Sequence, residues 1–323
     1  MKSGRLAVTW FLAFAFAMAM PASGSAQPYP SRPVTLIVPF GSGTAIDTIG
    51  RAISQELAVS LKQPVVVENQ NGATGAIGTS FVARAKPDGY TLLINSSSGI
   101  LAELRGESQT RLLRDFSPVA SVGNAPYTLA VRKDFPASTM ADVLALARAR
   151  PGSLTYVSLS GGGPQFLGEG LRRLADINIV EIPYKNTTDA QLDVMSGRVD
   201  LWFVPAGNAA PLVNSGKIKV LAVLGKDRSP ILEGVPTMAE AGIQSLDQVF
   251  SFYFFAPAGT PKEVLQTLST TIEKAMASDN VKRALLSLGV APRFETPQVA
   301  SATLRDEYRE WGTLLKAGTP RHP

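Results

Sequence analysis

Residues 34–61 read Val-Thr-Leu-Ile-Val-Pro-Phe-Gly-Ser-Gly-Thr-Ala-Ile-Asp-Thr-Ile-Gly-Arg-Ala-Ile-Ser-Gln-Glu-Leu-Ala-Val-Ser-Leu, and three local patterns follow one another along this stretch. The apolar, β-branched run at 34–38 predicts a buried strand, which Pro39 ends. Apolar residues at spacings of three and four then mark one buried face of a helix: Ile46, Ile49, Ile53, Leu57 and Leu61. A strand, a loop of small residues and a helix in this order are typical of α/β folds.

The loop between this strand and this helix, residues 40–47, is called the first loop below. The first N–H groups of a helix have no internal partner and lie at the positive end of the helix dipole. Glycines admit a ligand to the backbone and hydroxyl groups add hydrogen bonds, so a carboxylate is the expected ligand. The candidate ligand-binding residues here are Phe40, Gly41, Ser42, Gly43, Thr44, Ala45 and Asp47. An ordinary βα turn, with Asp47 as a first-turn charge, is the alternative for this stretch by itself.

The pattern of the first loop continues downstream. Residues 63–69 and 91–94 predict two further strands, with a glycine-rich loop and a helix at 76–85 between them. This alternation predicts a doubly wound α/β domain, in which ligands bind outside the carboxyl ends of the strands. The serine loop at 95–99 leaves such an end, so Ser96 and Ser97 are further candidates. A solvated loop without a ligand is the alternative.

A second strand–loop–helix unit follows about 120 residues later. A strand at 154–158 is predicted to run into a loop at 159–166, called the second loop, and a helix follows at 167–175. Two such units in separate α/β halves predict two anion-binding edges that face each other across a cleft. The candidates in the second loop are Ser160, Gly161, Gly162, Gly163, Gln165 and Phe166. Packing of Phe166 in the core of the second half is the alternative for that residue.

Two later strands, at 180–184 and 199–204, supply the last candidates, Tyr184 and Phe203. A tyrosine at a strand end offers apolar area and a hydroxyl group to a cleft. The neighbouring Lys185 is read either as a contact for a second ligand anion or, preferably, as a surface residue. Further expected elements are strands at 125–132 and 218–224, a short helix at 236–241, an aromatic core strand at 250–256 and helices at 261–277 and 297–316.

Composition and charge exclude several classes of function. The chain has no cysteine, and its one histidine is His322, so a thiolate or zinc site and a histidine-based triad are excluded. No cofactor and no metal site are therefore expected. The 31 basic and 26 acidic residues are scattered along the chain. No run of basic residues points to nucleic acid, and the protein is expected to be a monomer.

The first 26 residues are expected to be a cleaved secretory signal peptide. Lys2 and Arg5 precede an apolar run at 6–20, and small residues lead to Ala26. This order of basic, apolar and small residues is that of a secretory signal, whereas the run is short for a membrane anchor, which is the alternative. The mature protein is accordingly expected in the periplasm.

Taken together, the landmarks resemble one family, the extracytoplasmic solute receptors of tripartite tricarboxylate transporters, also called Bug receptors. The resemblance spans nearly the whole chain after the signal, in the expected order. The segments that carry it are 29–33 (Tyr-Pro-Ser-Arg-Pro), 38–47, 63–69 (Gln-Pro-Val-Val-Val-Glu-Asn), 72–75, 85–93 (Ala-Lys-Pro-Asp-Gly-Tyr-Thr-Leu-Leu), 115–119 (Asp-Phe-Ser-Pro-Val), 182–185 (Ile-Pro-Tyr-Lys), 197–201 (Gly-Arg-Val-Asp-Leu), 235–237 and 256–261 (Ala-Pro-Ala-Gly-Thr-Pro).

The resemblance implies an α/β Venus-flytrap fold of the type II-like periplasmic binding proteins, with two lobes that are each a mostly parallel sheet flanked by helices. Lobe 1 would comprise residues 27–128 and 250–323, and lobe 2 residues 129–249. Strand crossovers near 125–131 and 249–255 would form the hinge. The resemblance also implies that the two loops hold a ligand carboxylate through backbone N–H groups, and that the receptor delivers a small organic acid to a membrane transporter.

The sequence departs from the family pattern at positions expected to line the cleft. Gln165 and Phe166 stand where the family often has Ser and His, and Val204 and Pro205 where it often has Asp and Asn. Residues 41–44 replace the usual Pro-Ala-Gly-Gly, and Asn186 replaces a glycine. These changes favour a ligand with one carboxylate and a less polar body, aromatic ligands included, over citrate.

Two alternatives to a transport receptor remain open from the sequence. The first is a ligand-loaded partner of a membrane signalling protein, which has the same expected fold and site. The second is an enzyme on the same fold, in which Asp, Glu, Lys or Tyr side chains would perform acid–base chemistry. The lack of cysteine and the placement of the single histidine at position 322 disfavour the enzyme.

Overall fold

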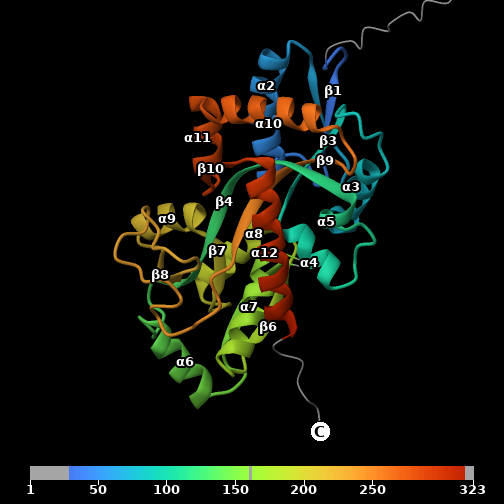
Figure 1. The fold of residues 1–323 in the computed structure, drawn as a ribbon. Helices are drawn as coiled ribbons and strands as arrows, with labels where there is room; N and C mark the ends of the chain where they lie inside the picture. Colours follow the sequence, from blue (N-terminus) through green and yellow to red (C-terminus); the bar gives the residue numbers. More distant parts are fainter. Residues whose placement is uncertain (1–28, 160–161, 317–323) are drawn as a thin grey trace, which may run out of the picture. The chain divides into compact units, whose positions relative to one another are not determined.

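The computed structural model describes residues 29–159 and 162–316, and every helix and strand named below lies within Arg32–Pro323 (Figure 1). The expected signal peptide, the candidates Ser160 and Gly161, and His322 lie outside the described residues. In the part of the chain that the structure describes, no helix is both long and apolar enough to span a bilayer.

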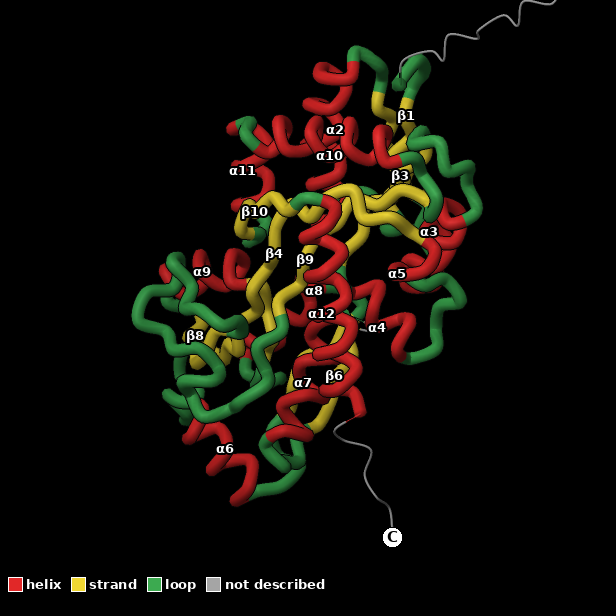
Figure 2. Tube along the Cα trace, in the orientation of Figure 1, coloured by secondary structure: helices red, strands yellow, loops and turns green. Residues whose placement is uncertain are grey.

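Ten strands and eleven α-helices alternate along the described residues (Figure 2). The strands are β1 (Val34–Val38), β2 (Val65–Asn69), β3 (Thr91–Ser96), β4 (Phe116–Arg132), β5 (Thr155–Leu159), β6 (Val180–Tyr184), β7 (Trp202–Pro205), β8 (Ile218–Val223), β9 (Val249–Pro257) and β10 (Ala291–Glu295). The helices are α2 (Ala45–Leu61), α3 (Ala76–Ala83), α4 (Ser98–Leu104), α5 (Leu112–Asp115), α6 (Met140–Ala149), α7 (Gly163–Leu174), α8 (Thr187–Ser196), α9 (Ala206–Asn214), α10 (Lys262–Met276), α11 (Asp279–Ser287) and α12 (Pro297–Lys316).

The predicted α/β class is confirmed by the order of these elements and by their pairing. β1 pairs in parallel with both β2 and β3, and α2 and α3 connect these strands. β5 and β6 form a second parallel pair, connected by α7, and a parallel bridge from Tyr156 to Leu201 brings the chain before β7 beside β5. The carboxyl ends of β1, β2 and β3 therefore share one edge, as do those of β5 and β6.

Two long strands connect these groups. β9 pairs antiparallel with β3 and with β4, and β4 also pairs antiparallel with β10, β7 and β8. Figure 1 shows β4 and β9 side by side, with α12 alongside β4. Because β4 pairs through its first half with β9 and β10 and through its last residues with β7 and β8, it is continuous through both groups.

Two local predictions are corrected. The strand expected at 125–132 begins at Phe116, and its register against β9 shifts near Pro118 and near Gly123, where bulges accommodate residues that interrupt a strand pattern. The helix expected at 236–241 is one capped turn. The Thr237 N–H donates to Glu240 and the Glu240 N–H donates to the Thr237 hydroxyl, and Gly242 then takes a φ of +92° and ends the turn.

The core is built from the aliphatic strands and from aromatic residues of α7, β9 and α12. Trp311 of α12 packs against Phe166 of α7 and Phe250 of β9, with ring centroids 5.2 Å and 4.8 Å apart. Trp311 and Phe166 are both fully buried. The aromatic strand expected at 250–256 is therefore confirmed as core, and this core holds β4 and β9 under α7 and α12.

Candidate ligand-binding site

The first loop is held together by the carboxylate of Asp47. Asp47 is 2% exposed, and its Oδ2 accepts the backbone N–H of Gly43 at 2.9 Å. Arg51 of α2 donates to both carboxylate oxygens at 3.0 Å, and Asn69 at the end of β2 donates to Oδ1 at 2.8 Å. The loop thus has a fixed backbone although Ser42, Gly43 and Thr44 are exposed.

These contacts keep Asp47 ionised. Burial by itself raises the pKa of a carboxyl group, but the hydrogen bonds from Arg51, Gly43 and Asn69 outweigh it and lower the pKa of Asp47 to about 2. Arg51 supplies a nearby positive charge. The loop therefore carries no uncompensated negative charge that would repel an incoming carboxylate.

The first turn of α2, which follows the first loop, has backbone N–H groups that can donate to a ligand. Thr44 is the N-cap of α2, and its hydroxyl accepts the N–H of Asp47 at 3.4 Å. Among the described residues, no acceptor is within hydrogen-bonding distance of the N–H groups of Ala45 or Ile46. Such first-turn donors, at the positive end of the helix dipole, are suited to a carboxylate oxygen.

The serine loop lies at the same edge but is occupied by internal contacts. The Ser97 hydroxyl is fully buried and donates to Glu307 of α12 at 2.7 Å. The Ser96 and Ser98 hydroxyl groups bond to each other at 2.6 Å. The backbone here continues as β3 and α4 instead of an open loop, so Ser97 serves in this conformation as a structural contact between β3, β9 and α12.

The helix expected from residue 167 begins earlier, because α7 starts at Gly163 and takes in the last four residues of the second loop; no side chain of a described residue caps it. The N-cap is Gly162, which has no side-chain hydrogen bond, and Pro164 follows in the first turn. Gly163 lies directly against β4 and β9, because a Cβ there would be 2.8 Å from Phe250 Cζ and 2.9 Å from Tyr127 Oη. The positive end of α7 is thus seated against the two long strands.

Gln165, a candidate from the sequence, belongs to a polar network that joins α4 to α7. Arg105, the C-cap residue of α4, donates to Gln165 Oε1 at 3.2 Å and lies 3.5 Å from the Glu169 carboxylate. Gln165 in turn donates to Glu181 of β6 at 3.0 Å. Arg105 therefore links the helix that follows β3 to the start of α7.

The aromatic candidates are placed inside the protein. Phe166 packs on Trp311, and Phe203 of β7 is also fully buried. Tyr184 is half-buried, and its hydroxyl donates to Asp193 at 2.8 Å. Burial and the Asp193 carboxylate raise the pKa of Tyr184 to about 12. Phe166 is fully buried, as in the alternative that the sequence left open, but the ring that covers it, Trp311, lies outside the second half to which that alternative referred. Lys185 is exposed as a surface residue.

The structure brings some predicted residues together and keeps others apart. Phe40 and Asp47 share Asn69 as a partner, and Ser97 is joined to β9. Gln165 is joined to the end of α4. No group of three or more potential metal ligands occurs among the described residues.

Three residues near these edges were not singled out from the sequence. Ser158 at the end of β5 is fully buried, and its hydroxyl has no hydrogen-bond partner among the residues that the structure describes. Arg105 follows an ordinary short helix, and only its tertiary partners reveal it. Ala206 begins α9 directly after β7, at an N-terminus without a side-chain cap, and the Pro205 that precedes it was the available signal.

Residues 49–319 match the family model described as the tripartite tricarboxylate transporter family receptor. The protein BugT of Bordetella pertussis is 35% identical over 300 residues, which cover 90% of this chain and 91% of BugT. A protein of Pseudomonas sp. strain P51, described as a UPF0065 protein in the tcbD-tcbE intergenic region, is 34% identical over 89% of this chain and 86% of its own length.

Solved structures show the same fold. The periplasmic binding protein BugD is 30% identical, with a TM-score of 0.74 over 89% of this chain and 98% of BugD. Rpa4515 of R. palustris, solved with adipate, is 33% identical, with a TM-score of 0.77 over 90% of this chain and 98% of its own. MatC of Rhodopseudomonas palustris, solved with malate, is 29% identical, with a TM-score of 0.76 over 89% of this chain and all of MatC.

Proposed function

The chain belongs to the tripartite tricarboxylate transporter receptor family, and from this premise we propose that it captures a small aliphatic dicarboxylate for delivery to a membrane transporter. Its fold is that of the periplasmic binding proteins, a mixed α/β fold. The family and its solved members are binding proteins. Delivery in the periplasm to a transporter is the further step of this proposal.

The observation that carries the proposal is the pair of helix N-termini that follow glycine-rich loops. The first loop is fixed by Asp47 while the N–H groups of Ala45 and Ile46 keep no internal acceptor among the described residues. The N-terminus of α7 has no side-chain cap. The two positive helix ends, with open N–H groups at the start of α2, suit a ligand with two carboxylates, one for each end.

The choice of a dicarboxylate differs from the ligand expected from the sequence. That expectation relied on Phe166 and Val204 as apolar walls of the site, and both side chains are fully buried in this structure. The relatives solved with ligands hold adipate and malate, which are aliphatic dicarboxylates. We therefore propose an aliphatic dicarboxylate as the ligand in preference to an aromatic monocarboxylate.

Capture is proposed to close two lobes on the ligand. The lobes are those expected from the resemblance, residues 27–128 with 250–323 and residues 129–249. A ligand that contacts both lobes binds the closed state better than the open state and shifts the population toward it. The Arg105 contacts to Gln165 and Glu169 cross from the first of these segments to the second, so they are proposed to form when the lobes meet.

The test is a calorimetric titration of the purified protein with adipate, malate and benzoate, with hexane-1,6-diol as the uncharged control. We expect one saturable site for at least one of the two diacids and no binding of the diol. Binding of benzoate alone would restore the monocarboxylate expectation. If no acid binds or raises the melting temperature, and none is released from the purified protein on denaturation, the receptor function is wrong.

Delivery needs a separate experiment. Uptake of the radiolabelled acid is measured in cells with the gene for this protein deleted and in the same cells complemented with it. Uptake that depends on the protein supports delivery to a transporter. Normal uptake in the deletion strain, together with tight binding in solution, would favour the sensory role instead.

A further inference from the structure

Two glycines that are far apart in the sequence touch through their backbones. Gly207 is the second residue of α9, and Gly289 lies in the turn between α11 and β10. A Cβ at Gly207 would overlap Gly289 Cα, and a Cβ at Gly289 would be 2.6 Å from both the Cα and the N of Gly207. Because ordinary carbon–carbon contacts are about 3.5–4.0 Å, neither position has room for a methyl group. The obstacles are backbone atoms, which cannot turn aside as a side chain can.

Backbone conformation explains only one of the two glycines. Gly289 has a φ of +73°, so glycine is favoured there whatever its surroundings. Gly207 lies in a helix, where its φ is not positive and where glycine is less favourable than alanine. The close approach of Gly289 is therefore the structural reason for glycine at position 207.

The register of the large sheet places Gly289 at the edge where the parallel strands end. Ser96, the last residue of β3, and Gly123 of β4 both pair with Phe252 of β9. Gly123 also pairs with Pro292 of β10. β10 runs antiparallel to β4, and therefore antiparallel to β3, so the chain just before Pro292 lies beyond the end of β3. Gly289 is in this stretch.

Gly207 lies beyond the corresponding edge of the second parallel group. A parallel bridge aligns the chain that enters β7 with β5, so β7 ends at the edge where β5 ends, and α9 begins directly after it. β7 pairs antiparallel with residues 127–130 of β4, and β10 with residues 121–124. The two edges thus face each other across residues 124–127 of β4, and Gly207 meets Gly289 in the gap between them.

The two glycines belong to segments that the proposed function places in different lobes, residues 129–249 and 250–323. α9 packs on β4, β7 and β8, whereas α11 packs on α2, α10 and β10, and the two helices also contact each other. Figure 1 shows α9 beside β10 and α11. The glycine pair is therefore a direct contact between the two proposed lobes.

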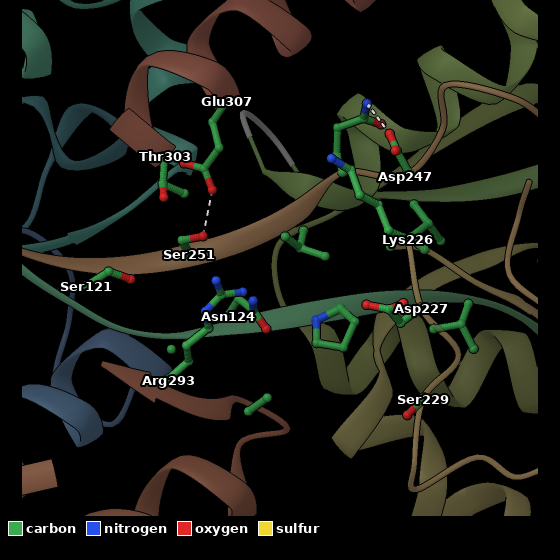
Figure 3. A pocket seen from close by; sticks show the side chains of 18 of the residues that line it. Ser121, Asn124, Lys226, Asp227, Ser229, Asp247, Ser251, Arg293, Thr303 and Glu307 are labelled. Atoms are coloured by element: carbon green, nitrogen blue, oxygen red, sulfur yellow. Dashed lines mark hydrogen bonds between the residues drawn. The ribbon is translucent and has the colours of Figure 1, made fainter. Parts of the chain in front are cut away.

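The same segments leave a cavity elsewhere along the hinge strands. It has a volume of about 430 Å³ and is lined by β4, residues 223–230, β10 and α12, among others. Figure 3 shows Arg293 on one side of this cavity and Asp227 on the other. Side chains around a cavity have room to shift, whereas the backbones of Gly207 and Gly289 are already in contact. A rotation that brings the two edges together is thus limited at the glycine pair.

We propose that the contact between Gly207 and Gly289 is a stop that sets the width of the closed cleft, and thereby the length of the dicarboxylate that the protein prefers. This inference rests on the proposed capture of a dicarboxylate between two lobes. Packed protein atoms resist compression, so the lobes close no further than the glycines allow. Both glycines lie beside β4, next to the expected hinge. A small change in their separation therefore becomes a larger change farther out, where the first and second loops hold the ligand.

The experiment is a calorimetric titration of the wild type and of Gly207→Ala with succinate, glutarate, adipate, pimelate and suberate, a series that lengthens by one methylene at a time. The added methyl group should hold the edges apart, so the diacid that the wild type binds best should lose about tenfold in affinity. The diacid that the variant binds best should be longer by at least one methylene. An unchanged order of preference overturns the proposal, whether or not the affinities fall.

Gly312→Ala is the matched control. Gly312 is a helical glycine of α12, and a Cβ there would be 3.6 Å from Leu104 Cδ2, which is an ordinary contact. Both substitutions exchange glycine for alanine within a helix, so helix propensity affects them alike. Gly312→Ala should keep the wild-type order of diacids, and Gly207→Val should shift the order further than Gly207→Ala. The same shift in Gly312→Ala would contradict a stop at Gly207.

The proposed function and the stop fail in different ways. If the wild type binds a diacid and Gly207→Ala keeps the same order of preference, the proposed function stands and only the stop is wrong. If the wild type binds no diacid, the proposed function is wrong, and small-angle X-ray scattering of the ligand-free proteins tests the stop. Gly207→Val should then have a larger radius of gyration than the wild type and Gly312→Ala, and equal radii overturn the stop as well.

Discussion

Gly43 is the residue at which the first loop is most open to a ligand. Its φ is +82°, and a Cβ there would meet no heavy atom within 4 Å. Gly43→Val should therefore fit sterically, cost about 1–2 kcal/mol of stability through the left-handed backbone, and obstruct the approach of a carboxylate. We expect adipate affinity to fall by about tenfold or more in calorimetry.

The matched control for this prediction is Gly242→Val. Gly242 has a φ of +92°, and a Cβ there would likewise meet no heavy atom within 4 Å, but this glycine lies in the turn at 237–242. Both variants should lose similar stability, and only Gly43→Val should lose affinity. Equal adipate affinities in the two variants would remove the first loop from the proposed site.

Glu307 should make stability depend on pH. It is 6% exposed, and burial raises its pKa to about 7 despite the hydrogen bonds from Ser251, Ser97 and Tyr253, with the charge of Glu295 adding to the rise. Between pH 4.5 and about 7 the folded protein retains a proton that the unfolded chain has released. The free energy of unfolding therefore falls as the pH rises through this window, by about 3 kcal/mol at most, and levels off above it.

Urea unfolding at pH 5, 6, 7 and 8 measures this effect, with Glu307→Gln as the comparison. Glu103 contributes in the same direction, because burial also raises its pKa to about 7. The variant should therefore lose part of the pH dependence and keep the part due to Glu103. An unchanged pH profile in Glu307→Gln would show that Glu307 is ionised throughout.

Between elements, the contact of Arg105 with Gln165 and Glu169 is the polar link from α4 to α7. The Arg105 and Glu169 side chains are 16% and 18% exposed, so their pairing is only partly screened by water. Arg105→Met should leave Glu169 without its counter-charge and lower the free energy of unfolding by about 1–3 kcal/mol. It should also weaken adipate binding, because the link is proposed to form when the lobes meet.

Arg114→Met is the control for this element-scale prediction. Arg114 is 63% exposed and pairs with its neighbour Asp115, so its loss should leave stability and affinity close to wild type. Chemical unfolding measures the stability of both variants, and calorimetry measures their affinity for adipate. If Arg105→Met behaves like Arg114→Met, the contact between α4 and α7 has no energetic role.

At the scale of the whole molecule, closure of the two lobes on a ligand should make the protein more compact. β4 is continuous through both groups of elements and β9 pairs with β4 over 249–257, so bending of these strands near 125–131 and 249–255 would let the lobes move as units. Saturating adipate should lower the radius of gyration measured by small-angle X-ray scattering. Gly43→Val at the same adipate concentration should show a smaller change, and an identical curve with and without adipate would argue against closure.

The sequence by itself determined the βα units and the loops at their ends. The runs predicted at 34–38, 63–69 and 91–94 correspond to strands at 34–38, 65–69 and 91–96, and helices follow the first and second loops, because apolar periodicity and the placement of glycine and proline act over a few residues. The importance of both glycine loops for binding stays a prediction. The ordered set of short motifs also pointed to the family that the comparison with known receptors confirms.

Only the tertiary structure decided which side chains these edges present. Phe166 is core because Trp311, far along the chain, covers it, and Gln165 is engaged because Arg105 reaches it from α4. The early part of β4 is a strand because β9 and β10 pair with it despite Pro118. The burial of a side chain, its ion pairs and the pairing of a strand depend on which distant segments come into contact. Local sequence patterns do not predict those contacts.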